Sequence, residues 1–116
     1  MSIEATFAIT SSDDLTSIRH DWLNDDDVEM GTWFHCETRH LAWVAEQLAL
    51  FLGEPTWGEA ELSDGNDALK ARLGGDFDRG DPWLLLENRR PRELPKGGFS
   101  TLRLDVSMAR QLAGLL

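Results

Sequence analysis

The sequence predicts an α+β fold in a single domain spanning residues 1–116, with a mostly antiparallel sheet packed by one long buried helix at about residues 39–52. Three observations carry this prediction. Apolar and polar residues alternate with a period of two near the N-terminus and again through the second half of the chain, as in half-buried strands. A long apolar segment with helical spacing lies between them. A length of 116 residues suits one ordinary domain and leaves no room for two.

The N-terminal part predicts a strand followed by a helix. Residues 3–9 alternate between apolar and polar side chains, which is typical of a half-buried strand. Residues 11–14 look like a helix start, because serine caps free N–H groups and aspartate is favoured in a first turn. The apolar residues that follow share one helical face: Leu15, Ile18, Trp22 and Leu23. We therefore expect an N-terminal helix at about residues 12–23.

The middle of the chain predicts a second strand at residues 30–37 and then the strongest helix. Thr38 is a good N-cap for residues 39–52, and Gly53 is a good C-terminal stop. Apolar residues cover this helix until only a narrow polar strip remains. We therefore expect the helix to be buried on more than one side.

The second half predicts a meander of strands and a short final helix. Glu59 and Glu61 alternate with apolar residues before a turn at residues 63–67, and Lys70 and Arg72 alternate after it. The acidic pair can face the basic pair across a hairpin. The remaining elements are a short apolar strand at 83–86, a loop at 89–98, a strand at 102–106 and a C-terminal helix at about 107–116 capped by Ser107.

Composition excludes several classes of protein. A single cysteine allows no disulfide within the chain, no apolar run approaches the roughly 18 residues of a membrane span, and the first ten residues do not resemble a signal peptide. A net charge of -10 argues against binding nucleic acid or an anionic membrane. We expect a cytoplasmic protein.

The charge is concentrated in one part of the sequence. Residues 1–69 hold fifteen acidic and two basic side chains, whereas residues 70–116 hold six acidic and nine basic ones. The densest acidic stretch is 21–29, and the densest basic stretch is 89–96. The acidic stretch is either a solvated loop or a docking face for a basic partner, and the basic loop could be a second contact site.

The sequence lacks a recognisable catalytic set, so we expect no enzyme activity, no cofactor and no metal. His35 and Cys36 would point to opposite faces of a strand, and a buried Cys36 beside a surface His40 is the expected arrangement. Asp76, Asp78 and Asp81 approach the spacing of a calcium loop, but the glycine falls in the wrong place.

The candidate site is a partner-binding surface built from carboxylates and tryptophans. Trp22 and Trp43 are expected in the core, whereas Trp33, Trp57 and Trp83 lie near strand ends, where a ring can be half exposed. Tryptophan is enriched at interaction hot spots. The predicted partner-binding residues are Asp21, Asp25, Asp26, Asp27, Glu29, Trp33 and Trp57.

The chain shows two resemblances to proteins of bacterial conflict systems. From residue 38 onward, the order of short sequence patterns resembles that of small immunity proteins against polymorphic toxins. These patterns are Thr38–Leu41, Gly58–Leu62, Arg79–Asp81 and Leu102–Leu112. Leu15–Leu23 resembles the first helix of effector-associated domains. Each resemblance implies a non-enzymatic binding module and assigns no role to a specific residue.

The leading hypothesis is a non-enzymatic immunity or inhibitor protein that neutralises a basic effector, such as a toxin or a defence nuclease. Acidic side chains would speed the encounter with a basic partner, and a tryptophan would anchor the contact. Two alternatives stay open: an adaptor or signalling module of a bacterial defence complex, and a phage-encoded inhibitor of a host defence system. The sequence leaves the oligomeric state open.

Overall fold

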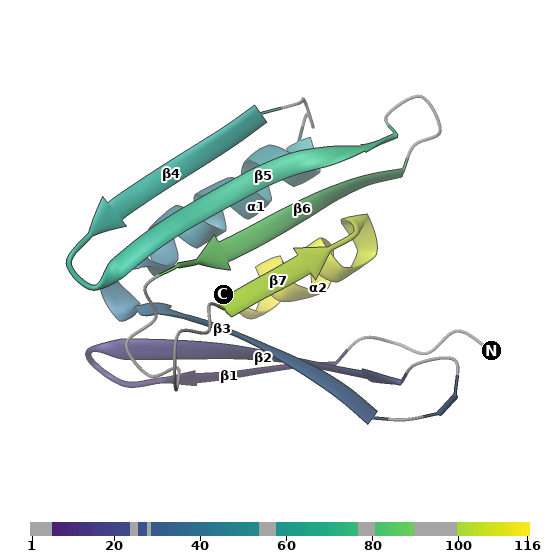
Figure 1. Cartoon of the computed structure of the whole chain (residues 1–116), viewed down its shortest axis with the longest axis horizontal. Helices are drawn as coiled ribbons and strands as arrows, with labels where there is room; N and C mark the ends of the chain where they lie inside the picture. The colour runs from purple at the N-terminus through teal and green to yellow at the C-terminus, as the bar shows by residue number, and fades with distance from the viewer. Residues whose placement is uncertain (1–5, 24–25, 28, 54–57, 77–80, 90–99) are drawn as a thin grey trace.

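The computed structural model describes residues 6–23, 26–27, 29–53, 58–76, 81–89 and 100–116. These residues form two antiparallel sheets and two α-helices, an α+β arrangement (Figure 1). The first sheet has the order β1 (Thr6–Ser11), β2 (Leu15–Leu23), β3 (Glu29–Glu37). The second has the order β4 (Gly58–Asp64), β5 (Asp67–Asp76), β6 (Asp81–Asn88), β7 (Ser100–Leu104). A 3-10 turn (Thr38–His40) and α1 (Leu41–Gly53) follow β3, and α2 (Val106–Leu115) ends the chain.

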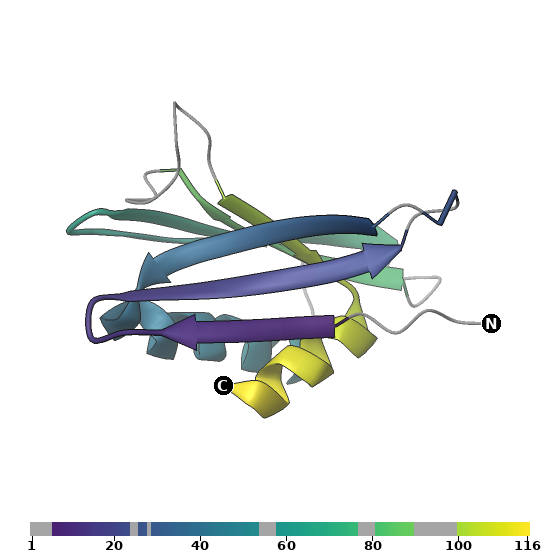
Figure 2. The ribbon, with the colours of Figure 1, turned by 90° about the horizontal axis from the view of Figure 1, so that it is seen from below.

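Both helices lie on the same side of the four-stranded sheet, behind it in the view of Figure 1 and below it in Figure 2. The inner face of that sheet supplies alternate apolar residues to the core, as a half-buried strand requires. The buried side chains of this face are Leu69, Ala71, Leu84, Leu86, Leu102 and Leu104. Val44, Leu48 and Phe51 of α1 and Ala109 and Leu112 of α2 pack against them.

The predicted N-terminal helix at residues 12–23 is wrong, because this segment forms the turn after β1 and then strand β2. Ser12 and its neighbours do cap free backbone groups, but they cap a turn: the Ser12 N–H donates to the Leu15 carbonyl at 2.9 Å, and the Leu15 N–H donates to Ser12 Oγ at 3.1 Å. Thr16, Ile18 and His20 alternate into the interior. Two of these buried residues are polar, so the strand period was hidden in the sequence.

The expectation of one sheet is also wrong, since β1–β3 and β4–β7 are separate sheets. The long helix was correctly placed, but its predicted burial on more than one side is not observed. Ala42, Ala45, Ala49 and Leu50 are exposed, and Leu50 shows 60% of its surface. Helix α2 was predicted correctly, although Asp105 rather than Ser107 caps it by accepting the Met108 N–H at 2.8 Å.

The predicted hairpin of the second half is confirmed, with its charge pairing. Glu59 lies opposite Arg72 and Glu61 lies opposite Lys70 in the β4–β5 register. Lys70 Nζ lies 3.3 Å from Glu59 Oε2, and Arg72 Nε lies 3.2 Å from Glu59 Oε1. The apolar segment at 83–86 falls within β6, an inner strand of its sheet. Among the described residues, neither helix is long and apolar enough to cross a membrane.

Candidate functional site

Trp33 lies in the middle of β3 with 45% of its surface exposed. Its neighbours Phe34 and Cys36 face the core, whereas Trp33 and its cross-strand partner Arg19 face outward. The guanidinium carbon of Arg19 lies 5.2 Å from the centroid of the Trp33 ring. Arg19 also donates from Nε to Asp21 Oδ1 at 2.7 Å. The structure therefore brings two of the predicted partner-binding residues, Asp21 and Trp33, onto one outer face.

The other predicted partner-binding residues lie at the turn between β2 and β3 or beyond the described part of the chain. Asp26 and Asp27 are exposed in this turn. Asp27 has φ of 60°, a left-handed conformation that short polar side chains tolerate. Glu29 begins β3, but its side chain is outside the described residues, as are Asp25 and Trp57.

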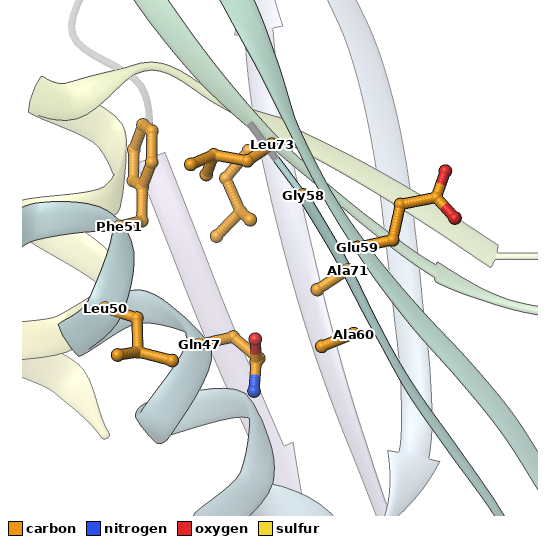
Figure 3. Close-up of a pocket in the computed structure, with 9 residues that line it drawn as sticks. Gln47, Leu50, Phe51, Gly58, Glu59, Ala60, Ala71 and Leu73 are labelled. Carbon is orange, nitrogen blue, oxygen red and sulfur yellow. The ribbon is translucent and has the colours of Figure 1, made fainter. Parts of the chain in front are cut away.

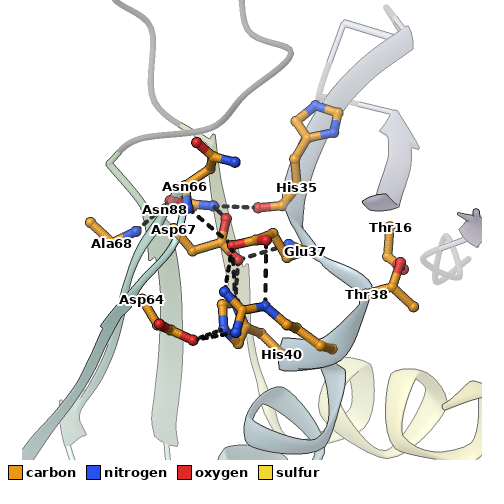
Figure 4. A network of polar contacts seen from close by, with 11 residues as sticks. Thr16, His35, Glu37, Thr38, His40, Asp64, Asn66, Asp67, Ala68 and Asn88 are labelled. Atoms are coloured by element: carbon orange, nitrogen blue, oxygen red, sulfur yellow. Dashed lines mark hydrogen bonds and ion pairs between the residues drawn. The ribbon is translucent and has the colours of Figure 1, made fainter. Parts of the chain in front are cut away.

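A cluster of charged side chains lies where β3 leads into α1, with His40 and Asp67 buried and Arg39 and Asp64 half exposed (Figure 4). Sequence reasoning missed this cluster. His40 is 5% exposed. Its Nδ1 lies 2.6 Å from Asp67 Oδ2, and its Nε2 lies 3.1 Å from Asp64 Oδ2. Ionised carboxylates only accept hydrogen bonds, so this geometry suits a charged imidazolium whose two ring nitrogens both donate. Burial opposes this charge, but the hydrogen bonds to Asp67 and Asp64 outweigh it and raise the pKa of His40 above its usual value.

Arg39 adds a second cation to this cluster. Its Nη1 lies 2.6 Å from Asp64 Oδ2, and its Nη2 lies 3.4 Å from Glu37 Oε2. The pKa of Asp64 is lowered by the His40 hydrogen bond first and by Arg39 next. The pKa of Glu37 is lowered mainly by the Asn66 N–H, which donates to Glu37 Oε2 at 3.0 Å. Three carboxylates thus surround two cations.

The cluster contains a candidate set of metal ligands in Glu37, His40 and Asp67, whose ligand atoms lie within 4.8 Å of one another. These atoms already bond to protein groups, however. Asp67 Oδ2 accepts both the His40 ring and the Glu37 N–H, the latter at 2.7 Å. A metal ion would have to break these bonds and displace a proton from His40. The geometry therefore fits a structural clamp between β3, the 3-10 turn before α1 and the β4–β5 hairpin.

Asn88 extends the clamp to β6. It is completely buried at the end of β6. Its Nδ2 donates to the His35 carbonyl at 2.7 Å and to Asp67 Oδ1 at 2.9 Å, and its Oδ1 accepts the Ala68 N–H at 3.1 Å. The His35 N–H donates to Ser100 Oγ at 3.2 Å. Side chains of β6 and β7 therefore bind the backbone of β3, which is an edge strand of its own sheet.

Cys36 is buried, as expected, but His40 is buried too and interacts with carboxylates rather than with the thiol. Burial first, and then the nearby carboxylates of Asp67 and Glu37, raise the pKa of Cys36 to about 12. Because the thiolate is the nucleophilic form, Cys36 is a protonated, non-nucleophilic thiol at neutral pH. Asp76, Asp78 and Asp81, the weak calcium pattern, have side chains outside the described residues.

An apolar pocket of about 220 Å³ lies between α1 and the β4–β5 hairpin (Figure 3). Leu50 and Phe51 border it on the helix, and Ala60, Ala71 and Leu73 border it on the strands. Glu59 points away from the pocket in Figure 3, toward solvent. The pocket offers apolar contact with few polar groups, so it carries no chemistry of its own.

Comparisons with known proteins add no identity to this geometry. No protein-family model matches the chain, and no curated protein sequence is significantly similar to it. The function must therefore be argued from the residues themselves.

Proposed function

We propose that this protein is a non-enzymatic binding protein that neutralises a basic effector protein through the outer face of β2 and β3. The observation that carries the proposal is Trp33, a large aromatic side chain that is 45% exposed although it lies within a regular strand. An indole at such a position has apolar area left to bury. Tryptophan is among the residues that contribute most to protein interfaces.

The ring of Trp33 is held in place before any partner arrives. Arg19 lies over it at 5.2 Å and is itself tied to Asp21 at 2.7 Å. Cation–π contact and strand backbone both restrict the ring, so binding would cost little conformational entropy. A restricted aromatic anchor favours a specific protein contact over a general adhesive patch.

The acidic residues at the end of β3 and in the turn beyond it suit a basic partner, although the charged group nearest to Trp33 is Arg19. Trp33 is four residues along β3 from Glu29, about 13 Å at the usual rise of a strand, and Asp26 and Asp27 lie in the turn just beyond. One interface of ordinary size covers about 800 Å² per partner, enough to include both the ring and the turn. The carboxylates of this turn would steer a cationic protein toward this end.

The first test uses the protein and two variants as bait in the native host, with captured proteins read by mass spectrometry. Wild type should retain a protein that is cationic at neutral pH, and Trp33→Ala should lose it, because truncating a hot-spot residue costs about 2 kcal/mol or more. Leu50→Ala is the matched control, since it also removes an exposed apolar side chain, but on α1. Equal capture by the Trp33→Ala variant would contradict the proposal.

A second measurement separates steering from anchoring. The association rate with the captured partner should fall by about tenfold or more between low and high salt, because steering is screened. Asp26→Asn with Asp27→Asn should slow association while leaving dissociation nearly unchanged, since asparagine also tolerates the left-handed conformation of position 27. An association rate that ignores salt would remove the electrostatic part of the proposal.

A further inference from the structure

A second cavity, of about 390 Å³, lies on the inner side of the first sheet. Its volume falls within the usual range of small-molecule sites, about 300–1,000 Å³. His20 and Thr32, which pair across β2 and β3, form one wall. Trp83 of β6, Arg103 of β7, and Asp105 and Met108 at the start of α2 form the others. Arg19 and Asp21, the neighbours of His20, point outward, so this cavity and the partner surface lie on opposite faces of β2.

His20 forms a largely buried part of the cavity wall. The side chain is 7% exposed, and its Nε2 has no hydrogen-bond partner among the described residues. Less than 1 Å² of this nitrogen is exposed, so a ligand in the cavity can contact the His20 ring but does not reach Nε2. Burial lowers the pKa of His20, and the carboxylates of Asp21 and Asp105 only partly offset it. Phe7 stacks on the ring with centroids 4.9 Å apart, which holds the imidazole in place.

Arg103 presents a fixed cation at the rim of the cavity. Its guanidinium carbon lies 5.1 Å from the centroid of the Trp83 ring. Trp83 in turn lies against Gly74: a Cβ at position 74 would meet the ring at 2.3 Å. The absence of a side chain at Gly74 therefore lets the indole lie flat across β5. A guanidinium stacked on such a ring is well placed to bind a carboxylate with two parallel hydrogen bonds.

Asp105 places a negative charge beside this cation. One oxygen, Oδ1, accepts the Met108 N–H at 2.8 Å and caps α2. Arg103 and Asp105 are two residues apart, so their Cα atoms are separated by about 7 Å. A free anion would be repelled by Asp105 and by the net charge of -10 on the chain. A free cation would be repelled by Arg103. A ligand carrying both charges matches both groups.

We propose that this cavity binds a small zwitterion with an apolar side group, such as a free α-amino acid. Its carboxylate would pair with Arg103 and its ammonium with Asp105. The apolar group would rest on Trp83 and Met108, beside the His20 ring. This site stands independently of the function proposed above.

The test uses L-leucine as the probe and follows the imidazole Cε1–H resonance of His20 by NMR. Two matched compounds each lack one charge: 4-methylpentanoate has no ammonium, and 3-methylbutylamine has no carboxylate. Leucine at millimolar concentration should shift the His20 resonance, and each half-compound should bind at least about tenfold more weakly, because each loses a charge-assisted hydrogen bond. A His20→Phe variant assigns the resonance.

Arg103→Gln should weaken leucine binding by at least about tenfold, whereas Arg110→Gln, an exposed arginine on α2, should leave it unchanged. Gly74→Ala should also weaken binding by displacing the Trp83 ring. All three variants keep His20, so each remains measurable by the same resonance. An unshifted His20 resonance at saturating leucine, or equal affinity for either half-compound, would overturn the proposal.

Discussion

His40 illustrates how one side chain can carry charge inside a protein when its partners are arranged around it. Asp67 Oδ2 lies 2.6 Å from His40 Nδ1, and Asp64 Oδ2 lies 3.1 Å from His40 Nε2. Removing the ring would leave Asp67, which is 2% exposed, with a buried charge that has lost its counter-ion. Breaking a buried pair in this way costs about 3–5 kcal/mol. His40 is therefore a determinant of stability.

This arrangement predicts how stability depends on pH. Because the folded pKa of His40 is raised, its contribution is fully present below the usual value of 6.5 and is lost as pH rises through the folded pKa. The lowered pKa values of Asp64 and Glu37 give contributions that are present above 3.8 and 4.5 and lost as pH falls. The clamp is therefore strongest between about 4.5 and 6.5.

The difference in free energy of unfolding between wild type and His40→Gln, measured by urea titration, should accordingly be larger at pH 6 than at pH 9. NMR titration of the His40 ring provides an independent check of the raised pKa. A difference that grows with pH would contradict the imidazolium assignment.

At the scale of elements, the β4–β5 turn depends on Gly65. Its φ is +62°, and a Cβ there would meet Glu37 Oε2 at 2.4 Å. Only the first of the two central turn residues has a positive φ, as in a type II′ hairpin turn. Asp64 and Asp67 flank this turn, so its shape positions two carboxylates of the clamp.

Gly65→Ala should therefore destabilise the protein by about 1–3 kcal/mol, from backbone strain and displacement of Glu37. Gly114→Ala is the matched control: the position is exposed in α2, and a Cβ there would have nothing within 4 Å. That change should be neutral or stabilising by up to about 1 kcal/mol, because alanine is a better helix former. Thermal unfolding of both variants compares the two effects, and equal destabilisation would refute the turn argument.

The elements that could be predicted from the sequence are those whose buried faces are apolar. In the β4–β5 hairpin, charged residues alternate with apolar ones, so the hairpin and its register could be predicted from this pattern. The charged residues are Glu59, Glu61, Lys70 and Arg72. Segment 15–23 was misassigned because its buried face includes Thr16 and His20, which are polar. Its apolar residues then mimicked helical spacing, and only the neighbouring strands decide the outcome.

The partner surface and the clamp also differ in how far they could be predicted from the sequence. Trp33 and Asp21 could be proposed from the sequence, because a tryptophan in a predicted strand and a cluster of acidic residues are both local features. The clamp could not, because His40, Asp67 and Asn88 lie far apart in the sequence and meet only when both sheets have formed. Asp64 and Asp67 were correctly recognised as turn residues, and this local role concealed their role as partners of His40.

At the scale of the whole molecule, two separate sheets are held together partly by one buried amide. Asn88 binds the backbone of β3, the carboxylate of Asp67 and the N–H of Ala68. Replacing it with alanine leaves all three groups without this partner. Each buried polar group left unpaired costs about 1–3 kcal/mol.

Asn88→Ala should lower the free energy of unfolding by at least about 2 kcal/mol and should increase amide hydrogen exchange in β1–β3 more than in β4–β7. The exposed Gln111→Ala on α2 serves as the control. Uniform acceleration of exchange across both sheets would show that Asn88 stabilises the molecule without joining its halves.

The reactivity of Cys36 can report how often the core of the protein opens. It is the only cysteine of the chain, it is 1% exposed, and its pKa is raised to about 12. An alkylating reagent can modify it only when the core between the sheets and α1 separates, so the rate of modification counts those events directly. A surface cysteine introduced at the β2–β3 turn would, in contrast, react at once. Such a variant could carry a dye beside the proposed partner surface while Cys36 stays unlabelled.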